Sequence, residues 1–210
     1  MKSRMWVRAG LAAAIVLAVC GVLPDRARAQ TQGVFEIDQR YASIEFSVDH
    51  LGLFTSHGDF QRFMGTLAID PARPDLTTIK VKIDARSVDM DSADGLTMVR
   101  SPDYFDVADH PSIAFQSTGV AVTGPDHYRI MGMIEIRGVS RPMTLEAVLA
   151  GRDKTPAGPL SEFIVDGTIN RGEFGMVADR TFVSDTVQVH IRARIALDHA
   201  TPSASGPHAG

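Results

Sequence analysis

The side chains that most often carry chemistry occur in this chain, but their spacing marks no metal site. The 210 residues include seven histidines, and no two of them lie two or four positions apart, the spacings that place two ligands on one face of a strand or helix. His50 and His57 are the closest pair. A metal would therefore need ligands that only the fold brings together, and the sequence predicts neither a bound metal nor a cofactor.

Carboxylates gather between residues 84 and 94 without forming a calcium loop. Counted from Asp89, an EF-hand loop needs Asp or Asn at its fifth position, Gly at its sixth and Glu at its twelfth. This chain has Ala93, Asp94 and Arg100 there. It also lacks a Gly-x-Ser-x-Gly elbow, a glycine-rich phosphate loop and a His-Glu-x-x-His motif. We therefore predict that the protein is not an enzyme, and that the aspartates belong to a solvated loop that caps a helix.

The first 29 residues have the layout of a cleavable secretory signal peptide. Three cations between residues 2 and 8 precede an uncharged apolar run over 9–23, and Ala27-Arg28-Ala29 is a small-x-small cleavage site. The run is shorter than the roughly 20 residues of a membrane-spanning helix, which argues against an uncleaved anchor. Val19 is too bulky for a lipoprotein signal at Cys20. We predict removal of residues 1–29 and export to the periplasm.

Removal of this segment changes both the charge and the thiol content. It takes five of the 21 Lys and Arg and one of the 25 Asp and Glu, which leaves 16 cations against 24 anions and a net charge of −8. Such a surface repels nucleic acid. Cys20, the single cysteine, leaves with the signal, so the remaining chain has no disulfide and no thiolate nucleophile.

The rest of the chain alternates apolar and polar residues with a period of two. This alternation is clearest over residues 44–49, 79–84 and 187–197, and it is typical of antiparallel strands with one buried face. Less regular runs cover residues 60–69, 113–118, 128–137, 144–149 and 163–169. Turn residues such as Asp70-Pro71 and Gly124-Pro125-Asp126 separate them.

The alternation fails in one internal segment, residues 91–101, where Leu96 and Val99 indicate a short helix. The last residues, 199–210, are Ala, Ser, Pro, Gly and His in composition and predict a disordered tail. The sequence therefore predicts one all-β domain over 33–198 with one short helical segment. On the alternation alone, a sandwich and a closed barrel remain equally open.

Short motifs lie at the joints of the predicted strands, in a fixed order along nearly the whole domain. They are Ile44-x-Phe46-x-Val48-x-His50-x-Gly52, Gly58-x-Phe60, Arg100-Ser101-Pro102-Asp103-Tyr104-Phe105-Asp106, His110-Pro111-x-Ile113-x-Phe115-x-Ser117-Thr118, Ile136-x-Gly138-Val139-Ser140-Arg141-Pro142, Asn170-Arg171-x-Glu173-Phe174-Gly175-Met176 and Val183-Ser184-Asp185-x-Val187. In this order and spacing they resemble the YceI-like family of small periplasmic lipid-binding proteins. Met98-Val99 departs from the His-Leu that the family usually has there.

The resemblance implies an eight-stranded antiparallel, lipocalin-like barrel around an elongated pocket for a polyisoprenoid, such as a quinone tail or a polyprenyl lipid. Eight strands leave room for packed side chains or one slim ligand, and burying hydrocarbon yields about 0.8 kcal/mol per CH₂. The binding site would then be an apolar lining. The predicted lining residues are Phe46, Val48, Phe63, Leu67, Val81, Ile83, Met98, Phe105, Phe115, Ile134, Ile136, Leu145, Phe163, Ile169, Val187 and Ile191.

Four polar residues at the strand joints are candidate contacts for a lipid head group: His50, Arg171, Glu173 and Asp185. For Arg171 with Glu173 or Asp185 we favour a structural ion pair between two loops. Two alternatives remain open. The same barrel can carry a fatty acid or a fatty amide, or His50 with Glu173 or Asp185 can act on a lipid head group as an enzyme.

The partners that the sequence predicts follow from the same resemblance. They are a long-chain lipid, no nucleic acid, and transient docking to a membrane redox or lipid-handling complex. The oligomeric state is not determined by the sequence, and a dimer is one option.

Overall fold

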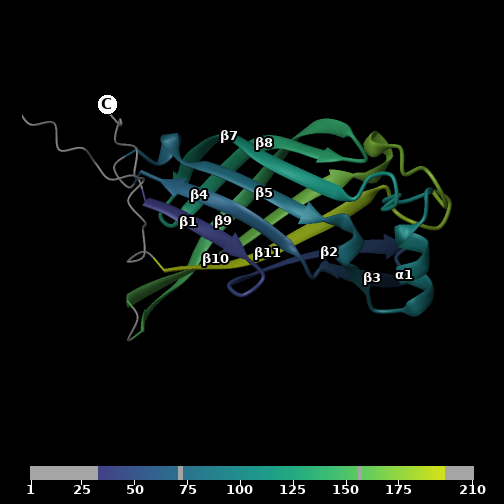
Figure 1. Ribbon diagram of the computed structural model, residues 1–210, viewed down its shortest axis with the longest axis horizontal. Helices are drawn as coiled ribbons and strands as arrows, with labels where there is room; N and C mark the ends of the chain where they lie inside the picture. Colours follow the sequence, from purple (N-terminus) through teal and green to yellow (C-terminus); the bar gives the residue numbers. More distant parts are fainter. Residues whose placement is uncertain (1–32, 71–72, 156–157, 197–210) are drawn as a thin grey trace, which may run out of the picture.

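The computed structural model describes residues 33–70, 73–155 and 158–196, which form one antiparallel β-sheet curled round an apolar interior (Figure 1). The predicted all-β fold with one short α-helix is confirmed. The predicted signal peptide, residues 1–29, and the predicted tail, residues 199–210, lie outside the described residues.

Strands dominate the described part of the chain. They are β1 (Gly33–Asp38), β2 (Ala42–His50), β3 (Phe54–Phe60), β4 (Phe63–Ile69), β5 (Thr78–Asp84), β6 (Val88–Met90), β7 (Ser112–Gly124), β8 (His127–Ile136), β9 (Val139–Thr155), β10 (Gly158–Asn170) and β11 (Thr186–Ala196). The α-helix is α1 (Ala93–Arg100), and three 3-10 helices are η1 (Pro74–Leu76), η2 (Ala85–Ser87) and η3 (Arg171–Phe174).

The predicted number of eight strands is too low, because two long strands are each broken in the middle. A turn over residues 39–41 separates β1 from β2, and Gln61 and Arg62 separate β3 from β4. β1 pairs with β4 and β2 pairs with β3, so one bent strand lies against another. With these two bent strands, the strands β5, β7, β8, β9, β10 and β11 complete the expected eight. The remaining β6 is a short addition beside β3.

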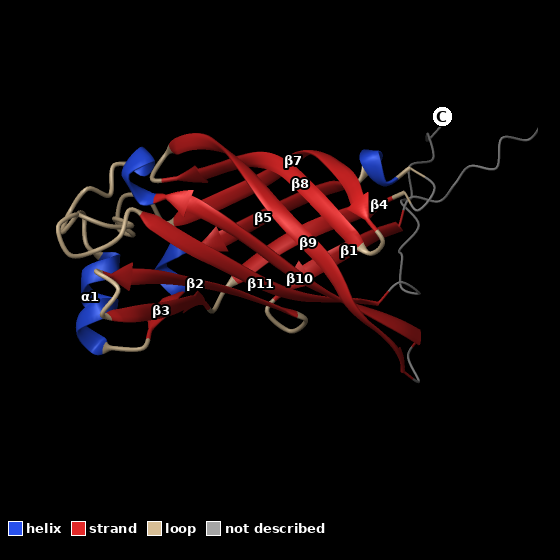
Figure 2. Ribbon diagram, turned by 180° about the vertical axis from the view of Figure 1, so that it is seen from behind, coloured by secondary structure: helices blue, strands red, loops and turns tan. Residues whose placement is uncertain are grey.

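The sheet curls back to the first of these bent strands. Its order is β1-β4-β5-β7-β8-β9-β10-β11-β2-β3-β6, and its neighbours pair in antiparallel fashion. Because β11 pairs with β2 while β1 pairs with β4, the two flanks of the sheet meet at the β1–β2 strand. The Arg194 N–H of β11 donates to the Tyr41 carbonyl in the β1–β2 turn at 2.8 Å. The strands tilt around a common interior when seen from both sides (Figures 1 and 2).

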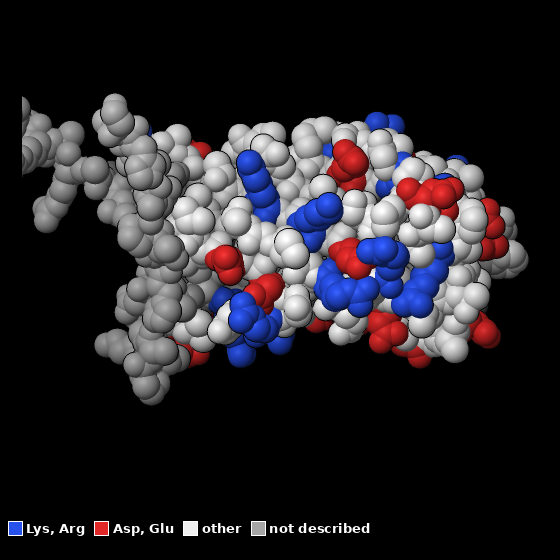
Figure 3. Space-filling model, in the orientation of Figure 1, with Lys and Arg blue, Asp and Glu red and all other residues white. Residues whose placement is uncertain are grey.

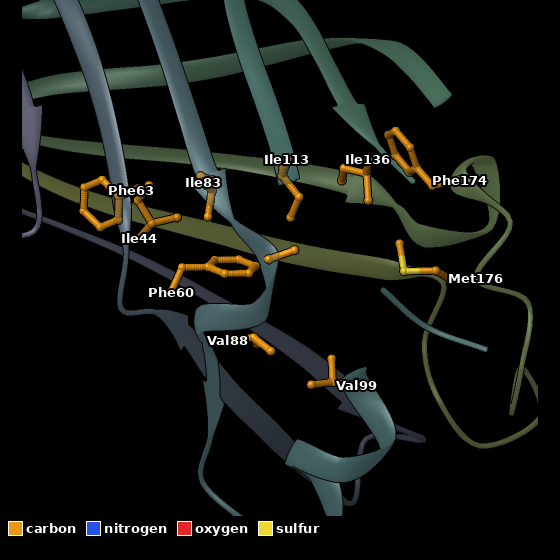
Figure 4. Packing of buried hydrophobic residues seen from close by; sticks show 11 residues of the cluster. Ile44, Phe60, Phe63, Ile83, Val88, Val99, Ile113, Ile136, Phe174 and Met176 are labelled. Carbon is orange, nitrogen blue, oxygen red and sulfur yellow. The ribbon is translucent and has the colours of Figure 1, made fainter. Parts of the chain in front are cut away.

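Alternation along each strand divides the side chains between this interior and solvent. In β4, Phe63 and Leu67 are buried, whereas Met64 is 71% exposed on the outer wall. The buried side chains form one large cluster toward the α1 end of the barrel. Figure 4 shows Phe60, Val88 and Val99 meeting there beneath the strands. A second cluster fills the middle of the barrel between β7, β8, β9 and β10.

α1 begins at a clear capping signal and packs one face against the sheet. Ser92 is its N-cap, and the Ser92 hydroxyl oxygen accepts a hydrogen bond from the Gly95 N–H at 3.1 Å. Val99 is the buried residue of this helix. At its last turn, Arg100 donates from Nη2 to the Val88 carbonyl at 2.8 Å. The predicted helix over 91–101 is thereby confirmed, and it stands at one end of the barrel.

Asp84 fixes the chain just before α1 and β6. Its carboxylate accepts from the Arg86 Nε at 2.9 Å and from the Arg62 Nη2 at 3.0 Å, and it caps η2 by accepting from the Arg86 backbone N–H. The hydrogen bonds from Arg86, and then from Arg62, lower the pKa of the Asp84 carboxyl to about 2. Asp84 therefore serves local structure by capping η2, whereas the N-cap of α1 is Ser92 rather than one of the predicted aspartates.

Candidate functional site

The curled sheet encloses a cavity of about 550 Å³. All eleven strands of the described chain and α1 contribute side chains to its wall. Most of these side chains are aliphatic or aromatic, because the inward-facing positions of the strands are the apolar half of each alternation. The volume lies within the roughly 300–1,000 Å³ typical of small-molecule sites in proteins.

The residues predicted to line a pocket all lie in this wall. They are Phe46, Val48, Phe63, Leu67, Val81, Ile83, Met98, Phe105, Phe115, Ile134, Ile136, Leu145, Phe163, Ile169, Val187 and Ile191. They come from distant parts of the sequence. The fold gathers the strand residues by placing one face of each strand inward, and it adds Met98 from α1 and Phe105 from the segment after α1. Contact between these side chains and a ligand stays a prediction.

Sequence reasoning missed other residues of the same wall. Ile44 and Ile130 are buried and line the cavity, and each continues the alternation of a predicted strand, so the periodicity contained the signal. Tyr104 and Met176 also line it, but they lie outside the strands in connecting segments. The alternation of apolar and polar residues in strands does not identify such residues, and only the tertiary fold brings them to the cavity.

Three phenylalanines form the cavity wall beside α1. The ring centroids of Phe46 and Phe60 are 5.5 Å apart, and the Phe105 ring lies 6.0 Å from Phe46 and 5.6 Å from Phe60 in edge-on contacts. Gly58 makes room for this cluster, since a Cβ atom there would lie 2.4 Å from Phe46 Cζ and 2.6 Å from Met90 Sδ. The aromatic end of the cavity thus depends on a glycine in β3.

His50 brings a polar group into the wall at the same end. Its Nε2 lies 3.0 Å from the Ser56 Oγ, and both residues line the cavity. The imidazole also stacks on the Phe54 ring, with centroids 4.3 Å apart and planes 10° from parallel. β2 and β3 position this pair, because His50 lies at the end of β2 and pairs in register with Phe54. An imidazole and a hydroxyl side by side can hydrogen-bond the polar end of a ligand.

Arg171, the second predicted head-group contact, also lies in the cavity wall, but its N–H groups are hydrogen-bonded to the backbone of the protein. It is buried, with 3% of its surface exposed. Its guanidinium donates to four backbone carbonyls of the segment after η3: Ser184 at 2.9 Å, Met176 at 3.0 Å, Ala178 at 2.7 Å and Val183 at 3.0 Å. Arg171 therefore holds the loop over residues 175–185 against the barrel, as the preferred structural interpretation expected.

Neither predicted carboxylate lies in the cavity wall. Glu173 is exposed in η3. Asp185 lies 3.5 Å from Arg171 Nη2 and 3.2 Å from Arg180 Nε, so the structural ion pair of Arg171 is with Asp185 and the predicted alternative with Glu173 is wrong. Ser56, rather than a carboxylate, is the hydrogen-bond partner of His50.

Tyr104 ties the loop over residues 175–185 to the segment after α1. Its hydroxyl donates to Asp179 Oδ2 at 2.8 Å, and its ring lies 5.8 Å from the Arg171 guanidinium. Burial, followed by the hydrogen bond to Asp179, raises the pKa of the Tyr104 phenol to about 12. Tyr104 and Arg171 together fix the loop that borders the cavity.

The described residues contain neither a cluster of metal ligands nor a membrane-spanning helix. Across residues 33–70, 73–155 and 158–196, no group of three or more His, Cys, Asp or Glu side chains is placed to hold a metal ion. Within the same ranges, no helix has both the length and the apolar character needed to cross a membrane.

An antiparallel sheet curled round an apolar cavity, with one short helix at its end, defines a class of small β-barrels that hold a hydrophobic chamber. The sequence match identifies one family within that class. Residues 35–195 match the YceI-like domain, and the chain belongs to the YceI-like family.

Two relatives agree with this assignment. The chain is 33% identical over 159 residues to a UPF0312 protein of Azotobacter vinelandii, covering 75% of this chain and 83% of that protein. It is 32% identical over 160 residues to protein YceI of Salmonella arizonae, with 75% and 83% covered.

The fold is similar to that of BcnA from Burkholderia cenocepacia, with a TM-score of 0.66 and 22% identity, over 74% of this chain and 96% of that one. It is also similar to a polyisoprenoid binding domain from Saccharophagus degradans, with a TM-score of 0.54 and 14% identity, over 79% and 99%. At these identities the likeness concerns the fold alone.

Proposed function

We propose that this protein binds and carries a long-chain polyisoprenoid, such as a quinone tail or a polyprenyl lipid, inside its barrel. The observation that carries the proposal is the cavity of about 550 Å³ with apolar side chains from every described strand. A long hydrocarbon matches such a wall without specific hydrogen bonds. At about 0.8 kcal/mol per buried CH₂ equivalent, one five-carbon isoprene unit contributes roughly 4 kcal/mol.

The polar end of the ligand is proposed to lie at the α1 end of the cavity, against His50 and Ser56. This pair lies at the same end of the wall as the aromatic cluster of Phe46, Phe60 and Phe105. A quinone carbonyl or a lipid hydroxyl can accept or donate a hydrogen bond there. Arg171 is less suited to this role, because its N–H groups already serve backbone carbonyls.

Binding rather than catalysis is the proposed activity. An enzyme that acts on a head group with His50 needs a carboxylate such as Glu173 or Asp185 to orient and activate the imidazole. Glu173 is exposed outside the cavity wall, and Asp185 is paired with arginines. The arrangement supports a binding site with a polar end more than an acid–base pair.

The proposed place of action is the periplasm, after cleavage behind Ala29, with docking to a membrane redox or lipid-handling complex as part of the carrier role. The layout of residues 1–29 as a secretory signal peptide supports the periplasmic location. Cell fractionation followed by intact-mass measurement tests it. A periplasmic chain that starts at Gln30 is expected, and an uncleaved chain in the cytoplasm would contradict it.

The binding proposal is tested by extracting lipid from protein purified from its own host and by adding polyprenols to the stripped protein. Ile191→Trp should reduce lipid binding, because Ile191 lies in the wall between the two main side-chain clusters. Gln188→Trp, at an exposed position of the same strand, is the matched control. A fatty acid or fatty amide in the extract would replace the polyisoprenoid as ligand. Equal binding by both variants would refute the cavity as the site.

A further inference from the structure

One end of the barrel exposes large apolar side chains that do not line the cavity. Leu51, Leu53 and Phe54, in the turn between β2 and β3 and at the start of β3, are 63%, 82% and 59% exposed. Phe182, in the loop over residues 175–185, is 61% exposed. These four residues, absent from the cavity lining, are called the apolar rim below.

The segments that carry the apolar rim are joined to each other and to the cavity end. The Ser184 N–H donates to the Asp49 carbonyl at 2.9 Å, which ties the loop over 175–185 to the end of β2. Figures 1 and 2 show the β2–β3 turn, α1 and this loop at the same end of the molecule. Met98 of α1 is 47% exposed and also lines the cavity. At Met98 the cavity wall therefore reaches the surface, at the same end of the molecule as the apolar rim.

The turn that carries Leu51 and Leu53 has a defined backbone. Leu51 and Gly52 have positive φ values of 54° and 71°, and the Leu53 N–H donates to the His50 carbonyl at 2.9 Å. A leucine in the left-handed region is uncommon. Because Leu51 is held in this conformation and is still exposed, packing within the barrel does not explain its side chain.

The charged residues around the apolar rim determine which kind of lipid surface it can bind. Segments 49–57, 91–106 and 175–185 together contain seven Asp and two Arg. Arg137 adds a third cation there, because its Nη1 donates to the Gly175 carbonyl at 3.1 Å, and the balance stays negative. Asp49, Asp91, Asp94 and Asp179 are exposed, and carboxylates appear along the outer edge of this end in Figure 3. Such a surface repels anionic lipids and attracts the outward ammonium group of a zwitterionic phospholipid.

We infer that the apolar rim docks on the surface of a zwitterionic phospholipid bilayer, with its side chains inserted between the head groups while lipid passes to or from the cavity. This inference rests on the proposed lipid-carrying function. Exposed leucines and phenylalanines on adjacent turns insert into the interface by burying apolar area, and the surrounding carboxylates select neutral over anionic surfaces. Met98 lines the cavity and is also exposed at this end of the molecule, so the proposed transfer would take place beside α1.

The test is flotation of the purified full-length gene product, as processed by the cell, with phosphatidylcholine–phosphatidylethanolamine vesicles. The variant Leu53→Ser/Phe182→Ser should lose at least about tenfold in vesicle binding, since two inserted side chains are removed. Met64→Ser/Val122→Ser removes two equally exposed apolar residues, 71% and 58% exposed, from other parts of the surface. This control should bind vesicles like the parent. Vesicles with added phosphatidylglycerol should bind the parent more weakly.

Direct insertion is read from Leu53→Trp, because residues 33–196 contain no tryptophan. Its emission should shift to the blue and be quenched by brominated lipids, whereas a Met64→Trp variant should not respond. Equal loss of flotation by the rim and control variants, or no response from the Leu53→Trp indole, would overturn the inference. So would a rim-dependent dimer in sedimentation without vesicles, which would make a second copy the occupant. The Leu53→Ser/Phe182→Ser variant should still bind polyprenol. Loss of vesicle binding without loss of polyprenol binding tests the docking inference separately from the proposed lipid-binding function.

Discussion

Replacing Arg171 by methionine should destabilise the barrel strongly, because it removes the side-chain donor of four backbone carbonyls. Arg171 is 3% exposed and donates to four carbonyls of the loop over residues 175–185. Two of these bonds, to Met176 and Val183, are buried. Each buried carbonyl left without a donor costs about 1–3 kcal/mol, and breaking a buried charged contact costs about 3–5 kcal/mol.

We therefore expect Arg171→Met to lower the free energy of unfolding by about 3–5 kcal/mol, a large part of the roughly 5–15 kcal/mol typical of a domain. Urea unfolding followed by circular dichroism measures it. The matched control is Arg129→Met, since Arg129 pairs with Glu146 on the outer wall with both side chains 51% exposed. That control should cost about 1 kcal/mol or less.

The two roles considered for Arg171 give different results in this comparison. A structural role predicts a large loss of stability, with lipid content per folded molecule unchanged under conditions where the variant stays folded. A head-group role predicts the opposite, with little loss of stability beyond the Arg129→Met control and a loss of bound lipid. The second result would refute the reasoning.

Three further changes test separate parts of the fold. Gly132→Ala should lower the free energy of unfolding, measured in urea, by about 1–3 kcal/mol. The added Cβ would lie 2.5 Å from the Phe115 ring and 2.7 Å from the Gln116 carbonyl oxygen. Gly151→Ala is the control and should cost little, because the nearest atom to its Cβ would be 3.9 Å away. Stability should fall as pH drops from about 4 toward 2, because the Asp84 pKa is about 2 when folded and near 3.8 when unfolded; an acid titration in which Asp84→Asn retains this slope would contradict that assignment. Stability should also fall as pH rises from about 10 toward 12, since the Tyr104 pKa is raised to about 12, and Tyr104→Phe should remove this alkaline slope.

Strand alternation was enough to predict an all-β domain and the inward-facing residues of its strands, whereas the barrel and its cavity were expected from the resemblance to the YceI-like family. Phe46, Val81 and Ile191 lie on the inward face of their strands because a period of two fixes which side of a sheet each residue occupies. Strand breaks could not be predicted in the same way. The interruptions at residues 39–41 and at Gln61-Arg62 depend on how two long strands bend around the barrel, which is a property of the closed sheet rather than of local sequence.

The polar residues were predicted least well, because their roles depend on neighbours far away in the sequence. The partner of Tyr104 is Asp179 in a distant loop, and Arg171 serves carbonyls that no motif identifies as unsatisfied. His50 was identified from its motif, but its partner Ser56 was not. Apolar patterning thus predicted which strand faces are buried, and the family resemblance predicted the chamber, while the hydrogen bonds at its end required the three-dimensional structure.

Native mass spectrometry of the protein purified from its own host tests the central claim most directly. The account predicts a folded chain that carries one noncovalent apolar molecule, whose mass after release fits a polyisoprenoid. It also predicts that Ile191→Trp loses this molecule and Gln188→Trp keeps it. A folded protein that carries no lipid and does not bind added polyprenol would contradict the account.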